Sequence, residues 1–216
     1  MGSVKLDAVK PGLLGPHCGI GEILPDPTQF GDREGSRRNF HSNADRRGGF
    51  ALKSRQCQDL CSAVEELQKG EQEMAGKRLG EAENHFRNAL RQSPNDYAGL
   101  VMMAACQLAQ KKLAEGLRYS EAAKAVYPQE AQAHHLSGYA KLQTRDYAGA
   151  YQDFSSYEKI LPGNPNAAFL KGFSLEGMGN KAEAAKEYHR YLQVVQEGKF
   201  AQYAYGRLVE WGYYKR

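Results

Sequence analysis

The sequence lacks an apolar run long enough to cross a bilayer. Hydrophobic residues make up 41% of the 216 residues and charged residues 25%, which is ordinary for a globular chain in water, and a membrane-spanning helix needs about 20 consecutive apolar residues. The N-terminal segment also lacks the apolar core of a secretory signal, because prolines and glycines interrupt it around Leu13 and Leu14. We therefore expect no membrane insertion, no cleavable signal peptide and a cytoplasmic location.

Cysteine and net charge are both scarce. The four cysteines are too few and too scattered to form a disulfide framework, which indicates a reducing compartment. They are Cys18, Cys57, Cys61 and Cys106. The formal net charge is only +4, and the two signs are interspersed along the chain. This pattern predicts no nucleic-acid partner.

Motifs of the common catalytic and metal centres are missing as well. The chain has no HExxH string, which would place two imidazoles and a glutamate on one helix face, and no CxxC pair. Cys57 and Cys61 would share one face of a helix, but two thiols do not complete a zinc site, so we expect them to be small packing residues. The sequence predicts no enzyme, no cofactor and no metal ion.

Tyrosine is absent from the first part of the chain, which differs in composition from the rest. None of the 13 tyrosines precedes Tyr97, whereas the first 50 residues hold 9 of the 23 glycines and 4 of the 8 prolines. The hydrophobic pattern has no sustained period there and becomes helical from about Gln56 onward. We therefore predict an irregular, flexible leader over residues 1–54 and a helical domain over residues 55–216.

An internal repeat organises the helical part. Pro94, Pro128 and Pro162 are equally spaced, and small or aromatic residues recur at the same interval. Small residues are needed where the two helices of a unit cross closely, and proline ends the second helix. The recurring positions are Gly70, Ala104, Gly138, Gly172; Ala82, Gly116, Ala150, Ala184; Phe86, Ser120, Phe154, Tyr188; and Ala89, Ala123, Tyr157, Tyr191.

This spacing and these positions resemble the tetratricopeptide repeat (TPR) family over about three quarters of the chain. The resemblance implies an all-α, right-handed solenoid of helix-turn-helix units with capping helices. The predicted units are 63–96, 97–130, 131–164 and 165–198, followed by a capping helix at 199–216. We expect a further helix that contains Cys57 and Cys61 before the first unit.

The resemblance also implies a binding surface on the concave side, which the first helix of each unit lines. The inward positions are then apolar and aromatic, and we expect Tyr139, Phe169 and Phe173 to form a cluster that faces solvent. The predicted groove residues are Val101, Met102, Ala105, Gln132, His135, Tyr139, Asn166, Phe169 and Phe173.

The predicted partner is a peptide or protein with an apolar segment. The leader itself is a second candidate, because its apolar stretches are tethered at high effective concentration. Deletion of residues 1–50 would then tighten binding of an added peptide.

Two alternatives remain open. The segment from Tyr188 to Arg216 is similar to the TPR arms of bacterial envelope zinc metalloproteases, so the chain could recruit substrates for a protease domain that it does not contain. Its location would then be periplasmic. The other alternative is a TPR-type chaperone that holds an apolar client segment.

Overall fold

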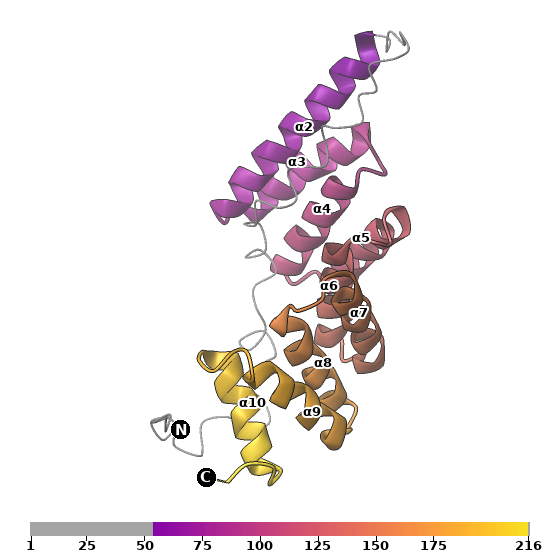
Figure 1. The fold of residues 1–216 in the computed structure, drawn as a ribbon. Helices are drawn as coiled ribbons and strands as arrows, with labels where there is room; N and C mark the ends of the chain where they lie inside the picture. The colour runs from indigo at the N-terminus through magenta and orange to yellow at the C-terminus, as the bar shows by residue number, and fades with distance from the viewer. Residues whose placement is uncertain (1–53, 216) are drawn as a thin grey trace.

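The computed structural model describes residues 54–215, and over this range the chain forms nine α-helices and no β-strand (Figure 1). The predicted leader, apart from Ser54, lies outside the described residues. The helices are α2 (Ser54–Ala75), α3 (Leu79–Gln92), α4 (Tyr97–Ala109), α5 (Leu113–Val126), α6 (Ala131–Gln143), α7 (Tyr147–Ile160), α8 (Pro165–Gly177), α9 (Lys181–Leu192) and α10 (Lys199–Glu210).

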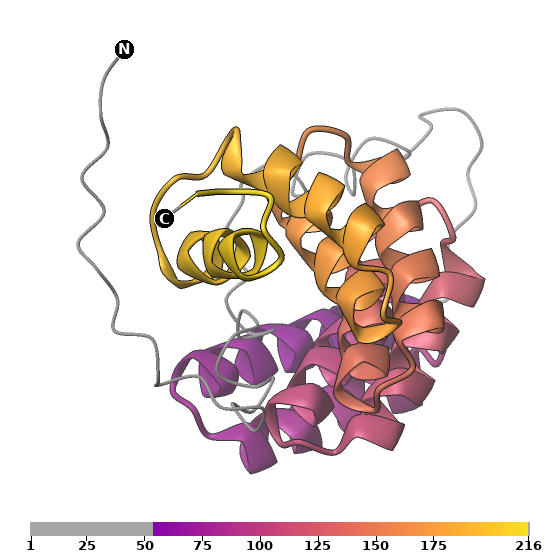
Figure 2. The same cartoon turned by 90° about the horizontal axis from the view of Figure 1, so that it is seen from below.

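The helices stack in chain order into a solenoid. Each helix packs against the next one, and α4 also contacts both α2 and α6, so the first helices of the first three units lie side by side. Seen along the stack, α2–α9 follow an arc (Figure 2). The prediction of an all-α helical solenoid is therefore confirmed. None of the described helices has both the length and the apolar character needed to cross a bilayer.

In the first, third and fourth units, close contact between a glycine and an aromatic ring joins the two helices. A Cβ atom added to Gly138 on α6 would lie 2.7 Å from the Phe154 ring on α7, and one added to Gly172 would lie 2.8 Å from the Tyr188 ring. Phe154 and Tyr188 have no exposed surface. Since a non-bonded carbon pair needs about 3.5 Å, glycine is the residue that lets these helices approach.

Two predicted helix boundaries are wrong. The helix expected before the first unit is not separate, because α2 runs without a break from Ser54 to Ala75; no proline or glycine occurs between Ser54 and Gly70 to end it. The hydrophobic pattern predicts the second helix of the last unit over residues 181–196, whereas α9 ends at Leu192. The backbone N–H groups of Val194 and Val195 both donate to the carbonyl of Tyr191, which closes a turn there.

The cysteines differ from one another in environment. Cys61 is exposed, so its expected role as a buried packing residue is wrong, and the side chain of Cys57 lies outside what the structure describes. Cys106 is fully buried on α4, where its thiol donates to the carbonyl oxygen of Leu79 at 3.3 Å. Burial raises the pKa of the Cys106 thiol, which makes it a poor nucleophile.

The glycine-to-ring contact can be tested by adding one methyl group. The change Gly138→Ala should destabilise the protein by about 1–2 kcal/mol, because overpacking outweighs the gain in helix propensity. Gly206→Ala on α10 is the matched control: nothing lies within 4 Å of its added Cβ, so stability should rise by up to about 1 kcal/mol. Urea titrations of both variants measure the difference; equal effects would contradict the packing argument.

Candidate functional site: the inner face of the first helices

Three positions that recur on the first helices of the second, third and fourth units contain most of the predicted groove residues. Ala98, Gln132 and Asn166 occupy one position on α4, α6 and α8, and all three are half-exposed. The other two positions are nearly buried in these three units. They contain Val101, His135 and Phe169, with exposed fractions of 7%, 1% and 2%, and Ala105, Tyr139 and Phe173, with 6%, 7% and 8%.

The C-terminal helix explains why Phe169 is buried. Its ring lies 4.9 Å from that of Phe200 and 6.1 Å from that of Tyr203, measured between ring centroids, and both partners lie on α10. The rings of Tyr188 and Tyr191 on α9 lie 5.7 and 5.3 Å away on centroid distances. The aromatic face of the last unit is thus used to hold the capping helix.

The prediction that Tyr139, Phe169 and Phe173 face solvent is therefore wrong, because all three side chains are buried. Phe173 lies 5.8 Å from Tyr203, measured between ring centroids, and joins the cluster around Phe169. Tyr139 belongs to the same continuous core. The contribution of these residues to partner binding stays a prediction.

Met102 and His135 occupy different surroundings. Met102 is half-buried and packs against the small core around Phe86. His135 lies between α6 and α7, with ring-centroid distances of 6.2 Å to Phe154 and 5.3 Å to Tyr157. Burial lowers the pKa of His135 to about 4, so the imidazole is neutral at physiological pH.

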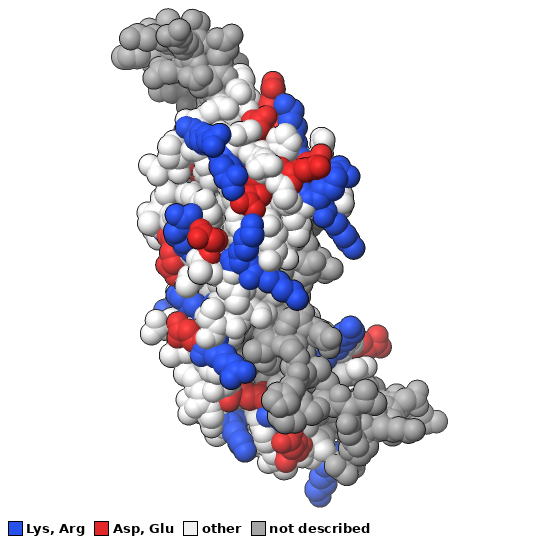
Figure 3. Space-filling model, turned by 180° about the vertical axis from the view of Figure 1, so that it is seen from behind, with Lys and Arg blue, Asp and Glu red and all other residues white. Residues whose placement is uncertain are grey.

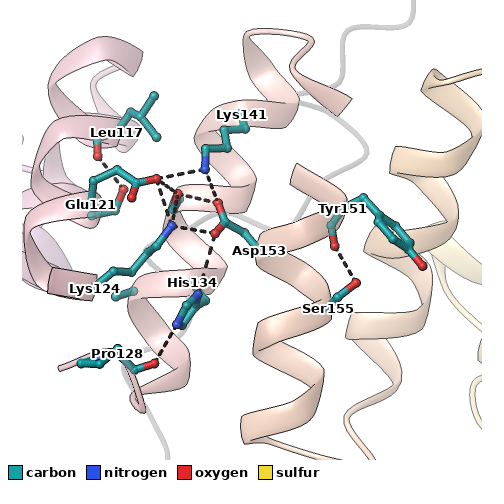
Figure 4. Close-up of polar contacts among 12 residues, drawn as sticks. Leu117, Glu121, Lys124, Pro128, His134, Lys141, Tyr151, Asp153 and Ser155 are labelled. Atoms are coloured by element: carbon teal, nitrogen blue, oxygen red, sulfur yellow. Dashed lines mark hydrogen bonds and ion pairs between the residues drawn. The ribbon is translucent and has the colours of Figure 1, made fainter. Parts of the chain in front are cut away.

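The polar network between the second and third units could not be predicted from the sequence motifs (Figure 4). Asp153 on α7 accepts hydrogen bonds from Lys124 on α5 at 2.6 Å and from Ser137 and Lys141 on α6 at 2.6 and 2.7 Å. Glu121 on α5 also pairs with both lysines, at 3.0 and 2.9 Å. Two carboxylates and two ammonium groups therefore neutralise one another across three helices.

The geometry of the network keeps the Glu121 carboxylate ionised. Burial by itself would raise the pKa of Glu121, but hydrogen bonds from the two lysines outweigh it and lower the pKa to about 2. His134 lies beside the network: its Nε2 is 2.9 Å from the carbonyl oxygen of Pro128, and its Nδ1 is 3.8 Å from Asp153 Oδ1. In the neutral ring, Nε2 carries the proton that is donated to the carbonyl.

The next junction uses the same positions with the charges rearranged. Lys171 on α8, which replaces Ser137 one unit later, pairs with Glu158 at 2.9 Å and with Glu187 at 2.8 Å. These two glutamates occupy the positions of Lys124 and Asp153. At the first junction the corresponding residues are apolar or aromatic, and they are Leu90, Met103 and Tyr119.

No cofactor chemistry is indicated within the described part of the chain. Among residues 54–215, no group of three or more His, Cys, Asp or Glu side chains is arranged to hold a metal ion. The ionisable residues with altered pKa values take part in packing and ion pairing. The inner face offers partly exposed amide groups above a buried apolar layer, an arrangement suited to contact with a polypeptide.

The buried imidazole predicts a pH dependence of stability. The pKa of His135 is about 4 in the folded protein, against about 6.5 in an unfolded chain. The unfolded state therefore binds more protons between these values, and stability falls as the pH drops from about 6.5, by about 3 kcal/mol at pH 4. Denaturant titrations of the wild type and His135→Phe across this range should diverge by that amount; parallel profiles would contradict it.

Removal of Asp153 should leave two lysines with one carboxylate between them. The side chains of Lys124 and Lys141 are only 16% and 19% exposed, so we expect Asp153→Ala to cost about 2–3 kcal/mol. The control is Glu115→Ala, which breaks an exposed pair with Arg118 and should cost less than about 1 kcal/mol. Equal losses in thermal or urea unfolding would mean that burial of the network contributes nothing.

Comparison with known proteins supports the helical arrangement. Residues 73–140 match the tetratricopeptide repeat family. No curated protein matches the sequence. Similar solved structures include MamA from Desulfovibrio magneticus RS-1, with a TM-score of 0.65 and 15% identity over 69% of this chain and 85% of that one.

Two further structures show the same fold. YrrB, described as a TPR protein with an unusual peptide-binding site, has a TM-score of 0.62 and 16% identity over 67% of this chain and 75% of that one. A thermophilic TPR protein from Thermus thermophilus, TTC0263, has a TM-score of 0.58 and 17% identity over 69% of this chain and 83% of that one. The family match at residues 73–140 lies within a continuous stack of helix pairs, so this part of the chain resembles the tetratricopeptide repeat family and the described chain has the same fold as the solved TPR structures.

Proposed function

We propose that this protein is a non-enzymatic scaffold that binds an extended peptide segment of a partner across the inner face of α4, α6 and α8. TPR proteins bind protein or peptide partners, and the family and the fold support that general role. Beyond this general role, we propose where the peptide binds and which chemical groups recognise it.

The half-exposed position on the first helices is the observation that carries the proposal. Gln132 and Asn166 lie one repeat apart at this position, so the repeat places two amide side chains at equivalent places on the first helices of successive units. An amide group can both donate to and accept from a peptide backbone. Such contacts recognise an extended segment with little dependence on its side chains.

The layer beneath these amides supplies rigidity. His135 and Phe169 are nearly fully buried, so their side chains do not need to be ordered when a partner arrives. A preformed surface loses little conformational entropy on binding. Half-exposed Met102 at one end of this face is an adaptable apolar contact for the partner.

The test uses substitutions that block the surface without entering the core. Peptides selected from a phage-displayed library on the full chain should bind Gln132→Arg/Asn166→Arg at least about tenfold more weakly, because two long charged side chains would cover the amide positions. The matched control, Gln152→Arg/Gln202→Arg, changes exposed positions on α7 and α10 and should bind as the wild type does. Isothermal titration calorimetry measures both.

Equal affinity for the two variants would place the peptide elsewhere and refute the proposed surface. Failure of the library to yield any binding peptide would also count against it. Occupation of the same surface by the leader stays a prediction, since residues 1–53 lie outside the described part of the chain. No observation favours the protease arm or the client chaperone over this scaffold.

A further inference from the structure

The turns between the two helices of each unit share one backbone geometry. At the first turn, the N–H of Lys77 donates to the carbonyl of Met74, and the N–H of Arg78 donates to that of Glu73. The same pair of hydrogen bonds closes the turns at Lys111, Arg145 and Gly179. Because the turns are equivalent and successive units stack, these four positions lie along one edge of the solenoid.

Three of the four positions have a cation in a backbone conformation that favours glycine. Lys77, Lys111 and Arg145 have φ values of 58°, 60° and 63°, whereas the fourth unit has Gly179 with φ 81°. A residue with a Cβ is disfavoured there by steric contact, and glycine is not. At three positions the chain therefore has a long basic side chain, although glycine there would make the folded protein more stable.

None of these three cations has a carboxylate partner among the residues that the structure describes. All three are exposed. On the face of the molecule drawn in Figure 3, Lys and Arg side chains recur along the stack with Asp and Glu among them. Elsewhere the basic side chains commonly pair: Arg78 contacts Glu73 and Lys112 contacts Glu83. Structural pairing therefore does not explain the three cations at the left-handed positions.

Helix electrostatics do not explain them either. Each cation lies between the C-terminus of one helix and the N-terminus of the next, so the favourable and unfavourable end charges largely cancel. The turns between units, at residues 93–96, 127–130, 161–164 and 193–198, contain no Lys or Arg at all. Among the turns that connect the described helices, Lys and Arg therefore occur only in those on one edge.

We propose that this edge, formed by Lys77, Lys111 and Arg145, is a second interaction surface that binds an extended acidic peptide segment of a partner protein. An array of separate cations at regular spacing matches an extended chain of carboxylates, because each unit can engage one of them. Several weak, screened contacts then act together through the connected peptide.

The acidic segment has to come from another molecule. Residues 1–53 contain more Lys and Arg than Asp and Glu, so the leader does not supply the complementary charge. A polyglutamate segment does, and it contains no aromatic or apolar side chain that could bind to the inner face instead. This makes it the appropriate probe.

The experiment measures fluorescence anisotropy of a labelled oligoglutamate peptide with the full chain, at low and at physiological salt. We expect salt-dependent binding that weakens at least about tenfold in Lys77→Gln/Lys111→Gln/Arg145→Gln. The control, Arg91→Gln/Lys159→Gln/Lys199→Gln, removes three exposed cations that lie outside these turns and should bind within about twofold of the wild type. The variant Lys77→Arg/Lys111→Arg/Arg145→Lys should also bind normally.

A third variant separates binding from folding. Lys77→Gly/Lys111→Gly/Arg145→Gly should lose the peptide as the glutamine variant does, while its melting temperature stays equal to or above that of the wild type. Absence of peptide binding by the wild type at low salt, or equal weakening by the control, overturns the proposal. Tighter binding of an oligothymidylate of the same length, lost in the same variants, would also overturn it in favour of a nucleic-acid partner.

Discussion

The close approach of two helices within each unit is the contact on which the rest of the structure depends. Gly138 and Gly172 admit the rings of Phe154 and Tyr188 at distances that a side chain would not allow, and those rings are fully buried. Once the pair is closed in this way, its outer surface has to be covered by the next pair. The solenoid is therefore a consequence of a repeated local contact, and α10 packs against its last helix, α9.

The junctions between units differ although the units are alike. The three positions of the polar network contain different side chains at each junction between units. They are apolar or aromatic at the first junction. They are a cation, a serine and an anion at the second, and one cation between two anions at the third. A unit displaced by one repeat would bury like charges or leave a charge unpaired, which is costly. We infer that this alternation favours the native order of the units.

Both proposed surfaces follow from the way in which a repeat multiplies a single residue. One exposed position on the first helices becomes a row of contacts on the inner face, at Gln132 and Asn166, and one turn position becomes a row of cations at Lys77, Lys111 and Arg145. Each contact is weak in water, but a peptide that follows the stack meets all of them. The two rows differ in chemistry and therefore select different segments.

The sequence by itself determined the fold. Its repeat is visible in the equal spacing of Pro94, Pro128 and Pro162, and glycine and aromatic residues recur at the same interval. Such a repeat is typical of stacked helix pairs. It did not determine which aromatic residues reach the surface. Phe169 was expected in an open groove, but Phe200 and Tyr203 of α10 pack on it together with two tyrosines of α9. Likewise, only the tertiary structure brought Lys124 to Asp153 and put Lys111 in a left-handed turn, since periodicity predicts the face of a helix and not what packs on it.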